Sequence, residues 1–321
     1  MLALCQEMAE RGLAIDKAID PNGSGLVGLP FSGITTTLGS LGAKRTGAQP
    51  DAAALMVRLL RDAGIRRGSI VAVDSSGSFP GFAIATLVAS KEIGAEAVLI
   101  TSIGSSTYGA NRPEFTMADI VEALVARGVI PHSAAAISAG GGGDVGIGMD
   151  GEETAQALAR ARRYGALVLE ERELSRNVAA RRAVFERKGS PAVLVSIGGN
   201  WSAVGSGEAF AGRNGLLRPE DFPDEVPLGA GLIQDFLRSG IPVIRVLDVK
   251  DLCAKTGLAF DPTPWPERGR AALYRSVSAN RIAILSGPLI AIAVAVVIRR
   301  QNEKKATRLA SARGETANAK T

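Results

Sequence analysis

The chain has 321 residues, of which 46% are hydrophobic and 21% are charged, so the sequence predicts a globular protein and excludes a collagen-like or disordered chain. A single histidine and two cysteines exclude metal sites that need two imidazoles or four thiolates, and we expect no bound metal. The net charge of +5 lies entirely in residues 299–321, so the rest is neutral and lacks the basic stripe of a nucleic-acid-binding surface; we expect no nucleic-acid partner.

The first 48 residues predict an N-terminal helix followed by an extended lead-in. The apolar residues of 1–15 (MLALCQEMAERGLAI) fall on one helical face. This stretch lacks the basic start and the continuous apolar core of a signal peptide.

Residues 49–272 predict an α/β body, because short apolar runs alternate with helical patterns. The fold class we expect is a doubly wound, mostly parallel sheet, Rossmann-like. Residues 192–247 loosely repeat the strand–helix–strand order of residues 70–101, which leaves open a body of two halves. Helices are predicted over residues 51–63, 81–93, 116–127, 150–164, 171–188, 228–238 and 248–257, and strands over residues 70–73, 97–101, 133–138, 192–197 and 243–247.

A transmembrane segment is predicted over residues 273–298. Its centre, Ile282–Ile298, has seventeen uncharged residues and is followed by Arg299 and Arg300. A buried core helix is the alternative. The positive-inside rule places the basic, disordered tail 299–321 in the cytoplasm and the body on the other side. Either an anchor precedes this sequence, or the span delivers the protein tail-first and the body stays cytoplasmic.

Three of the predicted strands are followed by loops rich in glycine and serine. In parallel sheets ligands bind at the carboxyl ends of strands, and backbone N–H groups at a helix start favour anions. We therefore expect these loops to converge on one anion site, although each loop taken singly can be a simple turn. No Walker A or dinucleotide motif is present, so no cofactor is expected. The candidate ligand-binding residues are Ser75, Ser76, Gly77, Ser78, Gly104, Ser105, Ser106, Asn111, Arg112, Gly198, Gly199 and Asn200.

Charged and flexible positions near these loops have plainer interpretations. Arg112 is the nearest expected counter-charge, and Lys44, Arg45 and Arg213 also lie near the loops in sequence. The polar neighbours of Asp74 could orient it as a base, but a cap or turn role is favoured. For the glycine run 140–143 a hinge is favoured over a ligand cradle, and His132 is expected to be packed or at the surface.

Six segments of the chain match the pattern of one known family: residues 34–39 (ITTTLG), 73–80 (VDSSGSFP), 102–106 (SIGSS), 108–111 (YGAN), 113–116 (PEFT) and 197–201 (IGGNW). Together they resemble the poly-gamma-glutamate system protein family. The resemblance runs from about residue 20 to the terminal span. It implies a membrane-anchored accessory protein, encoded beside the synthase and export components that make γ-linked polyglutamate, with an anchor preceding Met1; it implies no catalytic residue.

Three functions follow from residues and resemblance together. The favoured one is a membrane-anchored accessory protein of the cell envelope that binds the glutamyl polymer or its precursor, with the synthase and export components as partners. The second is a hydrolase or amide transferase with a nucleophilic serine in segment 77–78 or 105–106, although the G-x-S-x-G elbow is absent. The third is a non-catalytic scaffold for the synthase subunits.

Overall fold

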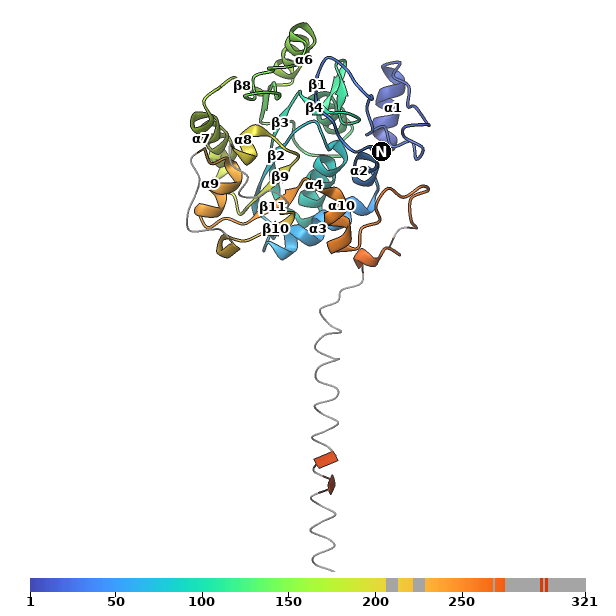
Figure 1. Cartoon of the computed structure of the whole chain (residues 1–321), viewed down its shortest axis with the longest axis vertical. Coiled ribbons are helices and arrows are strands. Elements are labelled where there is room, and N and C mark those ends of the chain that lie inside the picture. Colours follow the sequence, from blue (N-terminus) through green and yellow to red (C-terminus); the bar gives the residue numbers. More distant parts are fainter. Residues whose placement is uncertain (206–212, 222–228, 268, 275–294, 297, 300–321) are drawn as a thin grey trace, which may run out of the picture. The chain divides into compact units, whose positions relative to one another are not determined.

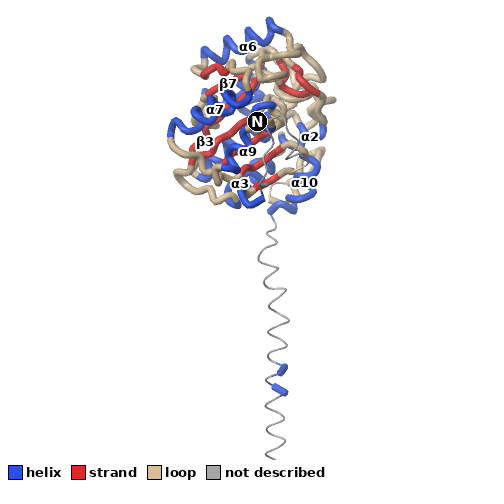
Figure 2. The backbone as a smooth tube through the Cα atoms, turned by 60° about the vertical axis from the view of Figure 1, so that its left-hand side comes forward, coloured by secondary structure: helices blue, strands red, loops and turns tan. Residues whose placement is uncertain are grey.

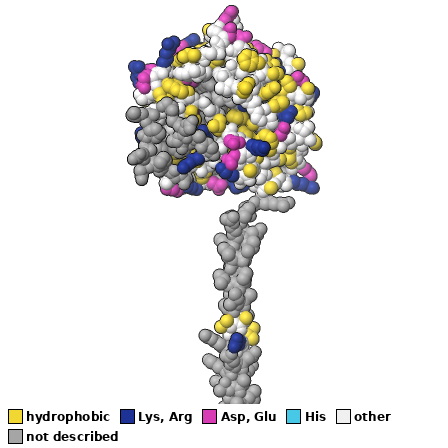
Figure 3. Space-filling view, in the orientation of Figure 1, with side chains coloured by type: hydrophobic (Ala, Val, Ile, Leu, Met, Phe, Trp, Pro, Cys, Tyr) yellow, Lys and Arg dark blue, Asp and Glu magenta, His cyan; other side chains and the backbone are white. Residues whose placement is uncertain are grey.

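The computed structural model describes residues 1–205, 213–221, 229–267, 269–274, 295–296 and 298–299 (Figure 1). The chain divides into two compact units, Met1–Leu273 and Tyr274–Thr321. All the elements that form the candidate site belong to the first unit. On the face of that unit shown in Figure 3, acidic and basic side chains are interspersed among apolar ones.

A seven-stranded sheet forms the centre of the first unit (Figure 2). Its strand order is β10-β11-β9-β2-β3-β7-β8, and every neighbouring pair is parallel except β10 with β11. From β2 the chain adds β3, β7 and β8 on one side, and then adds β9 and β11 on the other side. The strands are β2 (Ile70–Ser75), β3 (Glu96–Ser102), β7 (Ala136–Ser138), β8 (Leu167–Leu169), β9 (Val193–Ile197), β10 (Gly215–Leu217) and β11 (Val243–Val246).

Helices cover both faces of this sheet. Successive residues of a strand point to opposite faces of the sheet. Alternate strand residues therefore belong to two different hydrophobic cores, one on each face. Val71 and Val73 belong to the core shared with α3 and α4, whereas Ala72 belongs to the core shared with α7 and α9. The helices are α1 (Leu2–Glu10), α2 (Leu41–Gly47), α3 (Asp51–Asp62), α4 (Pro80–Ile93), α5 (Met117–Ala126), α6 (Gly151–Arg163), α7 (Leu174–Phe185), α8 (Trp201–Val204), α9 (Leu232–Arg238) and α10 (Val249–Thr256).

The α/β class and the mostly parallel sheet are confirmed. Strand β2 continues two residues beyond the predicted range, because Asp74 and Ser75 are buried and pair with both β3 and β9. Two small sheets were not predicted. One pairs β1 (Thr35–Thr37) with β4 (Ser105–Ser106), and the other pairs β5 (Asn111–Arg112) with β6 (Phe115–Thr116).

The predicted membrane span lies largely outside the described part of the chain. Residues 282–294 and 297, and the tail from residue 300 onward, are not described. Within the described residues, no helix combines the length and the apolar character that crossing a membrane requires.

Close packing of α2 against α4 fixes the position of α2, which carries one side of the candidate site. A Cβ atom on Gly81 would lie 2.3 Å from the carbonyl oxygen of Gly47, so only glycine permits this approach. We expect Gly81→Ala to lower the free energy of unfolding by about 1–3 kcal/mol, the usual cost of overpacking.

Chemical denaturation measures this effect, and Gly151→Ala is the control. Gly151 also lies in a helix, but nothing lies within 4 Å of its added Cβ atom. The control should keep or slightly exceed the original stability, because alanine favours helix. Equal stability of the two variants would contradict the packing account.

Candidate functional site

The candidate site lies at the point where the strand order reverses, between β2 and β9. In open α/β sheets, ligands bind outside the carboxyl ends of the strands at this switch point. The loops after the two strands meet there: the Ser76 backbone N–H donates to the Ile197 carbonyl at 3.1 Å. Gly198 has φ +90°, and a Cβ atom on it would lie 2.3 Å from Ser76 Oγ, so glycine is required for this contact.

The loop after β3 joins the same edge. The Gly77 N–H donates to the Gly104 carbonyl at 3.2 Å, and the Ala110 N–H donates to the Gly77 carbonyl at 2.7 Å. The Ser106 N–H donates to Ser78 Oγ at 3.0 Å. The three predicted loops are therefore hydrogen-bonded to one another around one part of the sheet edge.

Two adjoining cavities open among these loops. The first, the hydroxyl cavity, has about 300 Å³, and its lining includes Ser76, Ser102 and Asn200. The second, the lysine cavity, has about 460 Å³, and its lining includes Lys44 and Ser106. Both cavities are lined by Thr37, Ser78 and Gly199.

Lys44 is the most unusual residue of the site. Helix α2 places it in the wall of the lysine cavity, where only 3% of the residue is exposed. Its Nζ lies 2.7 Å from Ser106 Oγ and 3.7 Å from the centre of the Phe79 ring. Burial lowers the pKa of Lys44 to about 7. Among the described residues, no carboxylate lies within 4.0 Å of this amine.

A buried ionic network adjoins the hydroxyl cavity, whose lining includes Asp144 and Asn200. Arg181 of α7 is fully buried, with Nη1 2.5 Å from Asp74 Oδ1 and Nη2 2.5 Å from Asp144 Oδ2. Asn177 donates to the same Asp144 oxygen, and Asn200 donates to Asp74 Oδ2 at 3.2 Å. Burial raises the pKa of Asp74, and the charge of Arg181 opposes this rise.

The glycine run 140–143 is attached to this network. Asp144 follows the run and holds the left-handed φ of 64°, while Ser138 Oγ donates to its Oδ1 at 2.7 Å. These bonds offset the cost of the backbone conformation. Gly140, Gly141 and Gly142 line the hydroxyl cavity. The glycine run therefore lies in the wall of a cavity. A ligand cradle, which the sequence favoured less than a hinge, requires this position.

The structure brings together only some of the predicted site residues. Ser76, Ser78, Gly104, Gly199 and Asn200 line the hydroxyl cavity, and Ser106 lines the lysine cavity. Ser75 and Ser105 are fully buried, and each hydroxyl donates to the carbonyl of the following residue. Gly77 and Gly198 support the loops through the contacts given above.

The remaining predicted residues lie elsewhere. Asn111 bonds the backbone of Leu29 through both amide atoms and so ties down the lead-in. Arg112, the expected counter-charge, donates to the Ala14 carbonyl and lines a separate crevice next to Met8 and Leu26. Arg45 pairs with Asp261 at 2.7 Å.

Neither Arg45 nor Arg213 is among the described residues that line the two cavities. His132 is exposed, 3.9 Å from Glu96. In the described part of the chain, no group of three or more His, Cys, Asp or Glu side chains could hold a metal ion.

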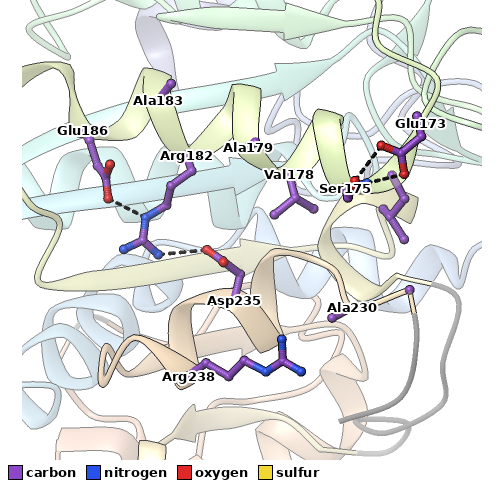
Figure 4. A pocket seen from close by; sticks show the side chains of 12 residues that line it. Glu173, Ser175, Val178, Ala179, Arg182, Ala183, Glu186, Ala230, Asp235 and Arg238 are labelled. Carbon is purple, nitrogen blue, oxygen red and sulfur yellow. Dashed lines mark hydrogen bonds and ion pairs between the residues drawn. The ribbon is translucent and has the colours of Figure 1, made fainter.

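A third cavity, of about 670 Å³, lies between α7 and α9 (Figure 4). Arg182 pairs there with Glu186 at 2.5 Å and Asp235 at 2.9 Å, and Glu173 accepts bonds from the first backbone N–H groups of α7. The two carboxylates compensate Arg182, and Glu173, Glu186 and Arg238 are exposed to solvent. Among the described residues that line this cavity, none is a buried charge without a partner, in contrast to Lys44 in the lysine cavity.

Comparison of the chain with protein-family models, with curated proteins and with solved structures returned no match. Function therefore rests on the chemistry of the two strand-end cavities.

Proposed function

We propose that the protein binds an anionic glutamyl ligand in the lysine and hydroxyl cavities, with a carboxylate against Lys44. The observation that carries the proposal is a buried lysine with a cavity beside it and no described carboxylate within 4.0 Å. A buried charge without a partner is costly, and a lysine reduces this cost by losing its proton. A bound carboxylate supplies the missing charge and restores the ammonium form.

The hydroxyl cavity supports the same class of ligand. Its serine and threonine hydroxyls and the Asn200 amide can donate to carboxylate and amide oxygens, which a γ-linked glutamyl chain presents at every residue. Lys250 also lines the lysine cavity and adds a second positive charge, whereas Asp248 adds a negative one. The paired cavities suit an extended ligand with several polar oxygens.

The resemblance to the poly-gamma-glutamate system family supplies the cellular setting of the proposal. In this setting the protein is an accessory component, and its partners are the components that make and export the polymer. The C-terminal span anchors it, with the tail in the cytoplasm and the body outside. The neutral charge of residues 1–298 and the basic tail support this orientation.

Replacement of Lys44 tests the proposal. Lys44→Met keeps an unbranched side chain of nearly the same length, one atom shorter, and removes its charge. We expect calorimetry at pH 6.5 to show γ-linked tetraglutamate binding at least about tenfold more weakly to this variant, since hydrogen bonds to charged groups contribute about 1.5–3 kcal/mol.

The full chain in non-ionic detergent is the sample, and Arg112→Met is the matched control. Arg112 lies outside both cavities, so its replacement should change the affinity less than twofold. No binding to the original protein would contradict the proposed ligand. A loss of affinity in Arg112→Met but not in Lys44→Met would place the anion site elsewhere.

A further inference from the structure

Lys44 and Ser106 have the geometry of a nucleophile and its base. We propose that Ser106 attacks the γ-carbonyl carbon of a glutamyl amide, with the neutral Lys44 amine as general base. This inference rests on the proposed glutamyl ligand and adds an acyl-transfer reaction at the same place. The 2.7 Å between Nζ and Oγ is within the range for proton transfer, and a pKa near the working pH is suited to a general base.

The fold directs Ser106, and not Ser105, toward the lysine. Strand pairing of β1 with β4 aligns Thr37 with Ser106, and the Ser106 N–H is held by Ser78 Oγ. Ser106 lines the lysine cavity. The Ser105 hydroxyl instead donates to the Ser106 carbonyl at 2.9 Å in a fully buried position.

Gly39 provides an independent indication that space at this pair matters. A Cβ atom at Gly39 would lie 2.8 Å from Ser106 Oγ and 3.1 Å from Lys44 Nζ. Its φ is not in the left-handed region, so the backbone conformation does not demand glycine. The missing side chain instead leaves open space directly over the two reacting atoms, within the lining of the lysine cavity.

The proposed reaction needs no oxidant, metal or histidine. As Ser106 Oγ bonds to the carbonyl carbon, its proton passes to Lys44 Nζ. The resulting ammonium gives that proton to the leaving amine nitrogen as the C–N bond breaks, and an ester on Ser106 remains. Water, or the amine of a second chain, then attacks the ester and loses a proton to Lys44, and that proton returns to Ser106 Oγ as it leaves.

The reaction and the proposed binding both use Lys44, but in different protonation states. The reaction needs the neutral amine, and carboxylate binding needs the ammonium. Hydrolysis converts the γ-carbonyl carbon into a carboxylate next to Lys44, and this carboxylate favours the ammonium form. The amide substrate is neutral at that carbon and leaves the amine free to act as a base. Carboxylate binding should therefore weaken with rising pH, whereas acylation of Ser106 should accelerate.

A serine-reactive fluorophosphonate tests the inference on the full chain in detergent. Peptide mass spectrometry should find one adduct, on Ser106, with a rate about tenfold higher at pH 8 than at pH 6, because the neutral fraction of a group with a pKa of about 7 rises by that factor. Lys44→Met should slow labelling about 100-fold. Gly39→Ala should also slow it, since both reacting groups remain but the space is filled.

Ser133→Ala is the control, because its hydroxyl bonds Glu122 away from both cavities. It should leave the labelling rate unchanged. Absence of a Ser106 adduct on the original protein at pH 8 overturns the inference without any variant having to fold. A rate that does not change between pH 6 and pH 8 overturns the role of Lys44.

The binding experiment separates this inference from the proposed function. Binding of γ-linked tetraglutamate without labelling of Ser106 overturns the reaction and leaves the binding. Labelling of Ser106 without such binding supports the nucleophile and overturns the glutamyl ligand.

Discussion

Arg181→Met should lower the free energy of unfolding by about 3–5 kcal/mol. Arg181 forms ion pairs with both Asp74 and Asp144, and all three side chains are buried. Removing one partner of a buried ion pair leaves an uncompensated buried charge, and here it leaves two. Chemical denaturation of the full chain in detergent measures the loss.

The neighbouring residue provides the matched control. Arg182 also forms two ion pairs, with Glu186 and Asp235, but it is partly exposed. Arg182→Met should cost at most about 1 kcal/mol, because solvent screens such pairs and the methionine keeps the packing against Phe236. Equal losses in the two variants would contradict the assigned role of the buried network.

The pH dependence of Arg181→Met identifies the cause of its loss. Without the guanidinium, which opposes the effect of burial, the pKa of Asp74 should rise further above its unfolded value. The folded variant then binds more protons than the unfolded chain, so its deficit should shrink as the pH falls from 7 toward 4. Asp74→Asn in the same background should recover part of the stability at pH 7.

The affinity for γ-linked tetraglutamate should fall by about 5-fold to 50-fold between pH 7 and pH 9. The smaller fall applies if the neutral lysine binds about tenfold more weakly than the ammonium, and the larger fall applies if it does not bind the ligand. The pKa of Lys44 in the free protein is about 7, so about half of the molecules carry the ammonium at pH 7 and about one in a hundred at pH 9. A carboxylate binds to the ammonium form, and binding above pH 7 therefore requires proton uptake. Calorimetry across this range measures both the affinity and the proton uptake.

Lys44→Met is the control for this dependence. Its weaker affinity should be nearly independent of pH across the same range. Asp248 and Lys250 line the same cavity and remain in the variant, so the comparison isolates the contribution of Lys44. The opposite outcome is an equally steep pH dependence in the variant. That outcome would contradict the role of Lys44.

Most of the sheet could be predicted because its strands are apolar and its helices carry clear end signals. Residues 192–197 and 243–247 are mostly apolar runs of the kind that buried parallel strands require, interrupted by Ser196 and Arg245, and β9 and β11 lie within them. Asp150 and Asp248 stand at the starts of two predicted helices, and each side chain accepts the backbone N–H three residues on.

The elements that complete the site gave weaker signals. Helix α2 (LGAKRTG) has two glycines and seven residues, which is too short for an apolar period to be recognised, and its stability comes from packing on α4. Strands β1 and β4 have two or three residues each and pair across about 70 positions of sequence. The sequence therefore named Lys44 only as one of several nearby cations.

Arg181 shows a second limit of sequence analysis. It lies in a helix with many charged residues, and such a helix is usually solvated. Arg181 and Arg182 are adjacent and identical, yet one is fully buried and the other is not. Only the position of α7 against the sheet separates them, and that position is set by tertiary packing.

The titration of Lys44 tests the central claim most directly. In protein with ¹³C-labelled lysine, one ε-methylene resonance, absent from Lys44→Met, should titrate with a midpoint of about 7. Saturation with γ-linked tetraglutamate should move this midpoint to higher pH, because the bound carboxylate favours the ammonium. If every lysine of the free protein titrates above about pH 9, in the ordinary range, or if the ligand leaves the shifted midpoint in place, the account is contradicted.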